Sequence, residues 1–258
     1  MSQNVFLWGA GWLGLPLSKS ISESGNNVSC ITRSCGKKNF LIAHSLNATT
    51  IDELVHEPKV LKKCDVFIIT VPPVAELSFD ESLSFFLKFL PQYCHVIYTS
   101  STGIYKNSNG LINENSEKDS IKDVFQIEDF LQKQKSQSLT ILRLGGLIGP
   151  KRHPVHFLAK KTVNENPNQV VNLVQQIDVI QVVLYFIESK KSGIFNVCSP
   201  EHPTRKEYYN LAAKAFGLKS LSFENDEHQS GKIVDTKKLV GLFPDFTFNS
   251  IYDFEKCK

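Results

Sequence analysis

The sequence predicts an α/β fold, in which a doubly wound parallel sheet carries helices on both faces and a small C-terminal lobe. Short apolar runs recur along the chain, and stretches of helical character separate them. The runs are continuous rather than alternating, and most connections are too long for hairpins. Both features are typical of parallel strands that are buried on both faces. A chain of 258 residues with 41% hydrophobic residues can build such a core.

The expected elements follow in order along the chain. Six strands are predicted at residues 5–8, 27–32, 65–71, 95–100, 139–144 and 193–197. Five helices are predicted at residues 14–24, 81–90, 124–135, 178–188 and 205–215. The last helix follows Thr204, and Glu207 stands at the spacing of a capping box. The polar residues 106–120 are expected to form a long loop, a kind of segment that often carries function.

Composition excludes several classes of partner. A net charge of +3 and the absence of any long basic run argue against nucleic-acid binding. No apolar run approaches the ~20 residues that a membrane span needs. The first residues have no basic segment of the kind that opens a secretory signal. The six cysteines form no C-x-x-C pair, so we expect no metal site, reduced thiols and a cytoplasmic protein.

A glycine-rich turn follows the first predicted strand. Gly9, Gly11 and Gly14 have the spacing G-x-G-x-x-G, with Trp12 and Leu13 between the last two. Gly9 allows a tight turn, Gly11 leaves room for a pyrophosphate beside the backbone, and Gly14 lets the helix pack against the sheet. The positive amino end of that helix then faces the phosphates. Strand, loop and helix in this order predict a Rossmann-type dinucleotide site, and the alternative is a purely structural glycine turn.

The end of the second predicted strand indicates which dinucleotide binds. NAD sites usually place an acidic residue ~20 residues after the loop, where it holds the ribose 2′-hydroxyl. Here the strand ends in Thr32-Arg33-Ser34, without an acid. An arginine can hold a 2′-phosphate through paired hydrogen bonds. We therefore predict NADP rather than NAD, with Arg33 and Ser34 in the site; the alternative is that Arg33 is a solvated surface residue.

Later motifs carry a family resemblance. They are YTSSTGIY at residues 98–105, NENS at 113–116, LRLGGLIGPKR at 142–152 and GIFNV at 193–197. In this order and spacing they resemble the extended short-chain dehydrogenase/reductase family, also called the NAD-dependent epimerase/dehydratase family. The glycine loop, Val71-Pro72-Pro73 and Gly231-Lys232 are most similar to its atypical, YeeZ-type branch. The resemblance covers nearly the whole chain.

The resemblance and the distribution of strands also predict the domain organisation. We expect an NAD(P)-binding Rossmann core in residues 1–150. A small substrate lobe is expected in residues 151–258, interwoven with the last core strands and helices. The resemblance further implies a homodimer that forms through the helices at 81–90 and 124–135.

The family's catalytic set is a Ser or Thr together with a Tyr-x-x-x-Lys pair. Ser101 matches the Ser position, but no Tyr-x-x-x-Lys occurs between Ser101 and Arg143. Tyr105 or Glu114 could supply the missing acid/base group. The alternatives are that Tyr105 only lines a cleft and that Glu114 stabilises a turn. A further candidate is Lys122, and the alternative is a surface residue, which is the common place for a lone lysine.

The remaining candidates lie near the expected carboxyl edge of the sheet, where ligands of such folds bind. The cofactor candidates beyond the glycine loop and the Arg33 segment are Val71, Pro72, Thr99 and Gly145. The substrate candidates are Thr102 and Arg152. Arg152 follows Gly149-Pro150 and could hold a phosphate or carboxylate of the substrate; the alternative is a surface arginine.

These observations predict the function only as a class. We expect an NADP-dependent oxidoreductase or an epimerase/dehydratase-like protein that acts on a small substrate, such as a nucleotide sugar or an anionic carbonyl compound. The alternative is a non-catalytic NADP-binding sensor or scaffold, which the missing Tyr-x-x-x-Lys pair favours.

Overall fold

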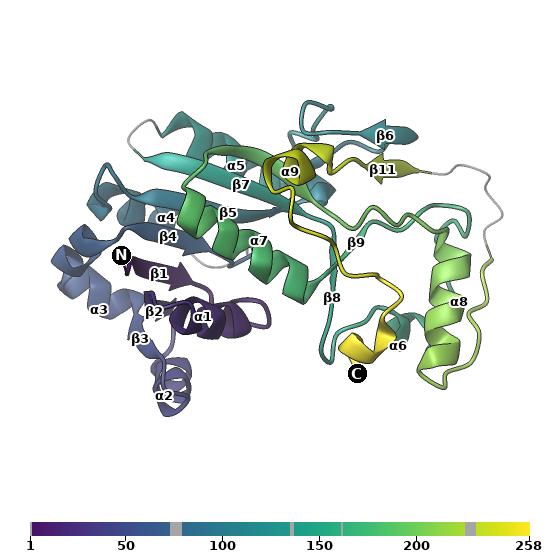
Figure 1. Ribbon diagram of the computed structural model, residues 1–258, viewed down its shortest axis with the longest axis horizontal. Helices are drawn as coiled ribbons and strands as arrows, with labels where there is room; N and C mark the ends of the chain where they lie inside the picture. Colours follow the sequence, from purple (N-terminus) through teal and green to yellow (C-terminus); the bar gives the residue numbers. More distant parts are fainter. Residues whose placement is uncertain (1, 73–78, 135–136, 161, 225–230) are drawn as a thin grey trace. The chain divides into compact units, whose positions relative to one another are not determined.

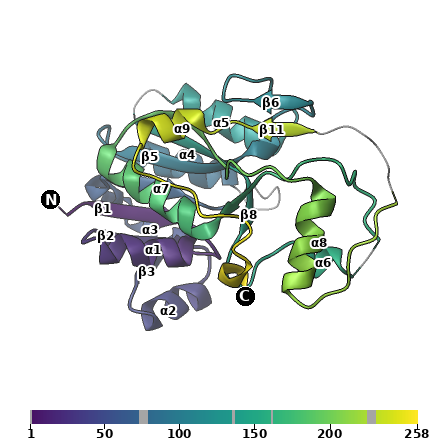
Figure 2. The same ribbon diagram turned by 45° about the vertical axis from the view of Figure 1, so that its right-hand side comes forward.

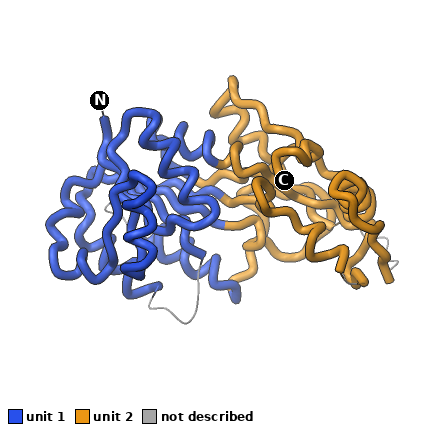
Figure 3. The backbone as a smooth tube through the Cα atoms, turned by 90° about the horizontal axis from the view of Figure 1, so that it is seen from below, with its two compact units in different colours: residues 1–100, 121–142, 180–193 blue, residues 101–120, 143–179, 194–258 orange. Residues whose placement is uncertain are grey.

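The computed structural model is described for all residues except 1, 73–78, 135–136, 161 and 225–230 (Figure 1). Two compact units divide the chain (Figure 3). Unit 1 comprises residues 1–100, 121–142 and 180–193, and unit 2 comprises residues 101–120, 143–179 and 194–258. The chain thus passes between the units several times. The expected division into a core of residues 1–150 and an interwoven lobe of residues 151–258 stays a prediction. Pro73 and Lys135, which belong to predicted features, lie outside the described residues.

A seven-stranded sheet organises the fold, with the strand order β10-β7-β5-β4-β1-β2-β3. The pairs β1–β2, β1–β4, β2–β3 and β4–β5 are parallel. The strands are β1 (Asn4–Trp8), β2 (Asn27–Thr32), β3 (Asn47–Thr50), β4 (Val66–Ile69), β5 (His95–Ser101), β7 (Ser138–Leu144) and β10 (Gly193–Val197). All six predicted strands are present, and the α/β class is confirmed.

Burial explains which strands the sequence revealed. Every residue of β4 is fully buried, so the strand is a continuous apolar run. β3 was not predicted, because it lies at the edge of the sheet and its sequence, NATT, is mostly polar and only partly buried.

Helices lie on both faces of the sheet. Figures 1 and 2 show α1 (Gly14–Glu23) and α7 (Gln176–Ser189) on one face, and α4 (Phe79–Phe89) and α5 (Asp123–Lys133) on the other. These helices and α8 (Arg205–Ala215) match the five predicted ones, and the capping box of Thr204 with Glu207 is confirmed. The helices that were not predicted include α2 (Cys35–Ala43), α3 (Ile51–His56) and the short 3₁₀ helix η1 (Pro58–Lys63). None of the helices in the described part of the chain has the length and hydrophobicity needed to cross a bilayer.

Unit 2 contains two small parallel sheets and its own apolar core. One sheet pairs β6 (Gly110–Ile112) with β11 (Lys232–Val234), and the other pairs β8 (Gly146–Ile148) with β9 (Leu173–Gln175). β6 lies within the segment that was expected to be a loop. The core gathers buried side chains from α6 (Val155–Leu158), α8 and the C-terminal η3 (Phe254–Cys257). A short helix, α9 (Lys237–Leu242), follows β11.

Candidate functional site

The glycine loop lies in unit 1, at the point where the strand order reverses. β1 stands between β2 and β4, and the chain leaves its carboxyl end through Gly9. The Gly9 carbonyl accepts hydrogen bonds from Gly11 N at 2.8 Å and from Thr70 Oγ1 at 2.6 Å. Thr70 was not among the predicted residues, although its place directly after the apolar run of β4 is a signal for this role. Ligands of open α/β sheets bind at such a reversal of strand order.

The three glycines of the loop serve different needs. Gly9 has a φ of +112°, and a Cβ there would lie 2.7 Å from Val71 Cγ2. A Cβ on Gly14 would lie 2.0 Å from the Gly9 carbonyl oxygen. Gly11, by contrast, is exposed, and no atom lies within 4 Å of the position of its Cβ. Packing therefore explains Gly9 and Gly14, whereas the open space at Gly11 fits the close approach of a pyrophosphate.

The amino end of α1 suits an anion. Leu13 occupies the N-cap and makes no side-chain hydrogen bond to the first turn. The first turn carries no acidic residue. Backbone N–H groups at such an end are available to phosphate oxygens. Leu13 is buried and Trp12 is half-buried.

Arg33 and Ser34 join β2 to α2. Arg33 is exposed, and the Ser34 hydroxyl accepts a hydrogen bond from Lys37 N at 3.2 Å. The first turn of α2 contains no acidic residue. A 2′-phosphate placed at this helix end would therefore meet a guanidinium and a helix amino end, and no carboxylate from that turn.

The predicted cofactor residues on β4 and β5 lie at the strand ends. Val71 is half-buried and Pro72 is exposed, immediately after Thr70. The Thr99 hydroxyl donates a hydrogen bond to the Ile69 carbonyl at 3.1 Å and so ties the two strands together. In unit 2, Gly145 is buried, and a Cβ there would lie 3.0 Å from the Asn172 carbonyl oxygen. Close packing thus accounts for this glycine, and its contact with a cofactor stays a prediction.

Ser101 is the exposed hydroxyl among the predicted catalytic residues. Its Oγ accepts a hydrogen bond from Gly103 N at 3.0 Å and caps the 3₁₀ turn η2 (Thr102–Ile104). Thr102, a predicted substrate residue, is 7% exposed and donates from Oγ1 to the Leu144 carbonyl at 3.2 Å. Ser101 is therefore placed to meet a ligand, whereas Thr102 is committed to the interior of unit 2.

Tyr105 and Glu114 belong to a buried cluster around Arg143. The Tyr105 hydroxyl donates to Asn196 Oδ1 at 2.6 Å and accepts from Arg143 Nη1 at 3.0 Å. Arg143 also donates to the Glu114 carbonyl at 3.0 Å, and the Glu114 carboxylate accepts from Asn196 N at 2.8 Å. Burial raises the pKa of Tyr105, against the opposing effect of the guanidinium. These contacts favour a structural role, and a catalytic role for either residue stays a prediction.

A second buried pair in unit 1 was not predicted. Ser100 donates from Oγ to Glu128 Oε1 at 2.5 Å, and both residues are buried. Glu128 lies on α5, and Lys122 at the N-cap of the same helix is half-buried.

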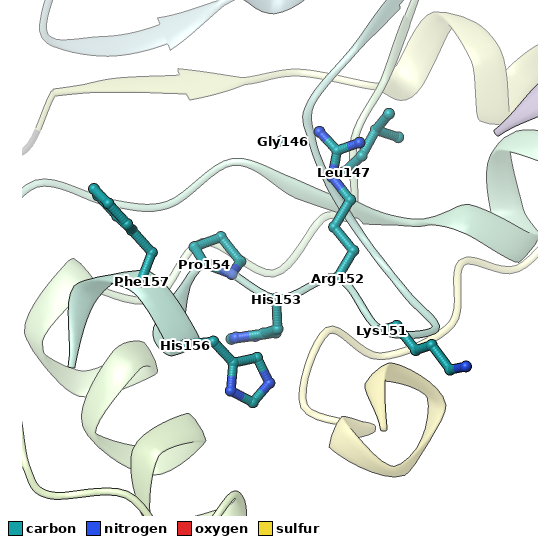
Figure 4. Close-up of a pocket in the computed structure, with 8 residues that line it drawn as sticks. All are labelled: Gly146, Leu147, Lys151, Arg152, His153, Pro154, His156 and Phe157. Carbon is teal, nitrogen blue, oxygen red and sulfur yellow. The ribbon is translucent and has the colours of Figure 1, made fainter. Parts of the chain in front are cut away.

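Arg152 lines a cavity of about 430 Å³ in unit 2. The lining residues are Gly146, Leu147, Lys151, Arg152, His153, Pro154, His156 and Phe157, and none of them is acidic (Figure 4). The Arg152 side chain extends towards Gly146 and Leu147, whereas the Lys151 side chain points the opposite way (Figure 4). The cavity thus combines a guanidinium with apolar and aromatic walls.

The wall of this cavity is held rigidly. His153 is 5% exposed; its Nε2 lies 2.9 Å from the Tyr208 hydroxyl, and its Nδ1 accepts from Val155 N at 3.2 Å. Burial lowers the pKa of His153 to about 4, so the ring is neutral at pH 7. The neighbouring turn is closed by reciprocal backbone hydrogen bonds between Gly149 and Arg152, with Lys151 at a φ of +57°.

The part of the chain that the structure describes contains no candidate metal site. There, no group of three or more His, Cys, Asp or Glu side chains is arranged to hold an ion.

The chain is similar to known proteins over almost its full length. No protein-family model matches it. The protein YeeZ of Escherichia coli K12 is 31% identical over 261 residues, which cover 92% of this chain and 93% of YeeZ. The Bordetella bronchiseptica enzyme WbmH, solved with NAD⁺, has a TM-score of 0.79 at 14% identity and covers 100% of this chain and 97% of its own. UDP-glucuronic acid 4-epimerase from Bacillus cereus, solved with NAD, has a TM-score of 0.76 at 18% identity, with coverages of 99% and 95%.

The fold and the glycine loop define a Rossmann-type protein with the architecture of these two solved structures. Because their sequence identity to this chain is low, the likeness establishes the fold and nothing about activity. The identity to YeeZ extends over nearly all of both chains. The chain therefore belongs to the YeeZ family.

Proposed function

We propose that this protein binds NADP and uses it in an oxidoreductase or epimerase/dehydratase-type reaction on a small anionic substrate. The observation that carries the proposal is the glycine loop at the reversal of strand order, with open space at Gly11. The NAD complexes of WbmH and of UDP-glucuronic acid 4-epimerase support a nicotinamide dinucleotide.

Different residues of unit 1 would contact different parts of the cofactor. The Gly11 backbone and the amino end of α1 would hold the pyrophosphate. Arg33 would hold the 2′-phosphate through paired hydrogen bonds, with Ser34 beside it. Val71, Pro72 and Thr99 would line the site at the ends of β4 and β5. The bound nicotinamide supplies a hydride acceptor or donor.

Arg152 would bind the anionic part of the substrate in the cavity of unit 2. A guanidinium recognises a phosphate or a carboxylate through two parallel hydrogen bonds. The apolar wall of Leu147 and Phe157 would exclude water from the rest of the ligand. This set of groups suits a sugar phosphate, a nucleotide sugar or a small carboxylic acid that carries a carbonyl group.

Ser101 is the hydroxyl that this proposal places at the reacting atoms. It is exposed, and Gly103 N orients its oxygen. Tyr105 and Glu114 are engaged around Arg143, so an acid/base role for either would require the cluster to open.

The second candidate function is a non-catalytic NADP-binding sensor or scaffold. The observation that favours it is the burial of Tyr105 together with the absence of a Tyr-x-x-x-Lys pair between Ser101 and Arg143. Consumption of NADPH with any member of a panel of carbonyl substrates would decide for the enzyme. The homodimer through α4 and α5 stays a prediction, which a sedimentation measurement would test.

The first experiment is a titration of the protein with NADPH and with NADH by fluorescence. Trp12 lies in the glycine loop, and Trp8 ends the adjoining strand, where it stacks on Phe79 at 4.9 Å. We expect NADPH to bind at least tenfold more tightly, a difference of about 1.4 kcal/mol. Arg33→Ala should remove this difference by weakening NADPH alone.

The matched control is Lys19→Ala, which removes an exposed positive charge from α1 away from its amino end. It should leave both affinities unchanged. Tighter binding of NADH would contradict the choice of NADP, and failure to bind either nucleotide would contradict the cofactor site itself.

A further inference from the structure

Two cysteine thiols meet at the amino ends of neighbouring strands in unit 1. Cys64 lies between η1 and β4, and Cys94 directly precedes β5. Their Sγ atoms are 3.6 Å apart, although the residues are 30 positions apart in the sequence. Both residues are fully buried. The pair is thus a contact of the tertiary structure, far from the glycine loop at the opposite ends of the strands.

The hydrogen bonds of the pair direct the two sulfur atoms towards each other. Cys94 donates from its thiol to Cys64 Sγ, and Cys64 donates to the Val66 carbonyl at 3.2 Å. The backbone N–H groups of the two cysteines donate to Leu61 and Pro91, which fixes the turns that carry them. A disulfide requires the sulfur atoms to close by about 1.5 Å.

Besides the thiol contact, a side-chain hydrogen bond at the surface joins the two turns. Tyr93, directly before Cys94, is 61% exposed and donates from its hydroxyl to the Lys62 carbonyl at 3.0 Å. Lys62 and Lys63, directly before Cys64, are exposed as well. We call this Tyr93–Lys62 hydrogen bond the clasp. In each turn, the residue directly before the buried cysteine is therefore exposed to solvent.

We propose that Cys64 and Cys94 form a dithiol that hydrogen peroxide oxidises to an intramolecular disulfide. In the first step one sulfur attacks a peroxide oxygen, the O–O bond breaks, and a sulfenic acid and one water result. In the second step the other sulfur attacks the sulfenic sulfur, and the S–O bond breaks. The oxygen leaves as a second water, so that both thiol protons end in water and the peroxide takes up the two electrons.

Burial of the two thiols makes this oxidation slow. Burial and the neighbouring Cys94 raise the pKa of the Cys64 thiol, so the reactive thiolate is scarce while the pair is covered. Oxidation then depends on opening of the two turns, which the clasp opposes. This inference does not rest on the proposed cofactor function.

The test is peptide mapping of the folded chain after exposure to hydrogen peroxide. It uses a Cys35→Ser background, because Cys35 is exposed and would form links between molecules. Free thiols are then alkylated in denaturant. We expect one cross-linked peptide pair that joins Cys64 to Cys94 and lacks two hydrogens. The pair should be absent from Cys94→Ser and from Cys64→Ser, of which either suffices if the other does not fold.

The role of the clasp can be tested by measuring the rate at which the cross-link forms. Tyr93→Phe should speed the cross-link by about fivefold, the factor expected from loss of one hydrogen bond. The control Tyr252→Phe, on a partly exposed tyrosine of unit 2, should leave the rate unchanged. No cross-link under conditions that fully oxidise Cys35 in the unsubstituted chain would overturn the proposal. An unchanged rate in Tyr93→Phe would overturn the role of the clasp.

Discussion

At the scale of single residues, Gly11 and Gly14 stand three positions apart but face different surroundings. The space beside Gly11 is open, and the space beside Gly14 is filled by the Gly9 carbonyl. A glycine that packing requires and a glycine that a ligand requires can therefore be distinguished by substitution. The sequence motif alone treats them alike.

We expect Gly11→Ala to leave the free energy of unfolding within about 0.5 kcal/mol of the unsubstituted value while it weakens NADPH binding by at least tenfold, about 1.4 kcal/mol. Gly14→Ala should destabilise the fold by about 2 kcal/mol or more, because its Cβ meets backbone that cannot move aside. Urea unfolding and fluorescence titration measure the two quantities. Equal effects of both substitutions on stability would contradict this division.

Tyr105 offers a second test at this scale. Its hydroxyl links Asn196 to Arg143, so Tyr105→Phe leaves buried polar groups with one partner fewer. We expect a loss of about 1–3 kcal/mol in the free energy of unfolding and unchanged NADPH affinity. If a turnover assay is found, kcat should persist in Tyr105→Phe and fall in Ser101→Ala. The reverse result would restore Tyr105 as the acid/base group.

At the scale of elements, helix caps were the local signals that the sequence carried most clearly. Thr204 accepts from Glu207 N, and the Glu207 side chain accepts from Thr204 N at 3.1 Å. The same box occurs at Thr50 and Glu53, where it begins α3. The second box was present in the sequence, but the short polar strand before it concealed the element.

We expect Thr204→Ala to lower the free energy of unfolding by about 1 kcal/mol, because the first turn of α8 loses its side-chain acceptor. Lys206→Ala, on the exposed face of the same turn, should change it by less than about 0.5 kcal/mol. Urea denaturation followed by circular dichroism compares the two variants. A smaller effect of Thr204→Ala than of Lys206→Ala would show that the cap does not stabilise the fold.

The local pattern of apolar and polar residues therefore predicted the strands that are buried on both faces, and the glycine loop that precedes α1. It could not reveal β6 or β11, because each has three residues and exists only through pairing with the other. It placed Tyr105 and Glu114 by motif, but their burial depends on Arg143 and Asn196, which come from separate strands. Thr70 was missed because its contact with Gly9 bridges two strands that are distant in the sequence.

At the scale of the whole molecule, two buried histidines make stability depend on pH. His95 contacts the hydroxyls of Ser138 at 2.6 Å and Thr140 at 3.0 Å, and Lys190 adds a nearby positive charge. Burial lowers the pKa of His95 to about 4, as it does for His153. The unfolded chain binds these protons near pH 6.5 and the folded chain only near pH 4.

The free energy of unfolding should therefore fall as the pH falls from about 6.5 to about 4, by about 1–2 kcal/mol for each ring after allowance for partial hydration. Urea midpoints at pH 7.5, 5.5 and 4.5 measure this change. His95→Gln should lose part of the slope, whereas His56→Gln, on the exposed end of α3, should retain it. An identical slope in both variants would contradict the role of His95.

The pairing of β6 with β11 has a consequence for synthesis on the ribosome. Asn109, beside β6, bonds to Gly231, beside β11, across 122 positions of sequence. β6 is therefore synthesised long before β11. Until β11 is synthesised, the backbone of β6, which carries the exposed Leu111, lacks this strand partner. Unit 1 ends at residue 193, so all of its residues are synthesised before β11, the closing strand of unit 2. Every residue of unit 1, including the glycine loop, is therefore present in the nascent chain before the unit that carries Arg152 can pair β6 with β11.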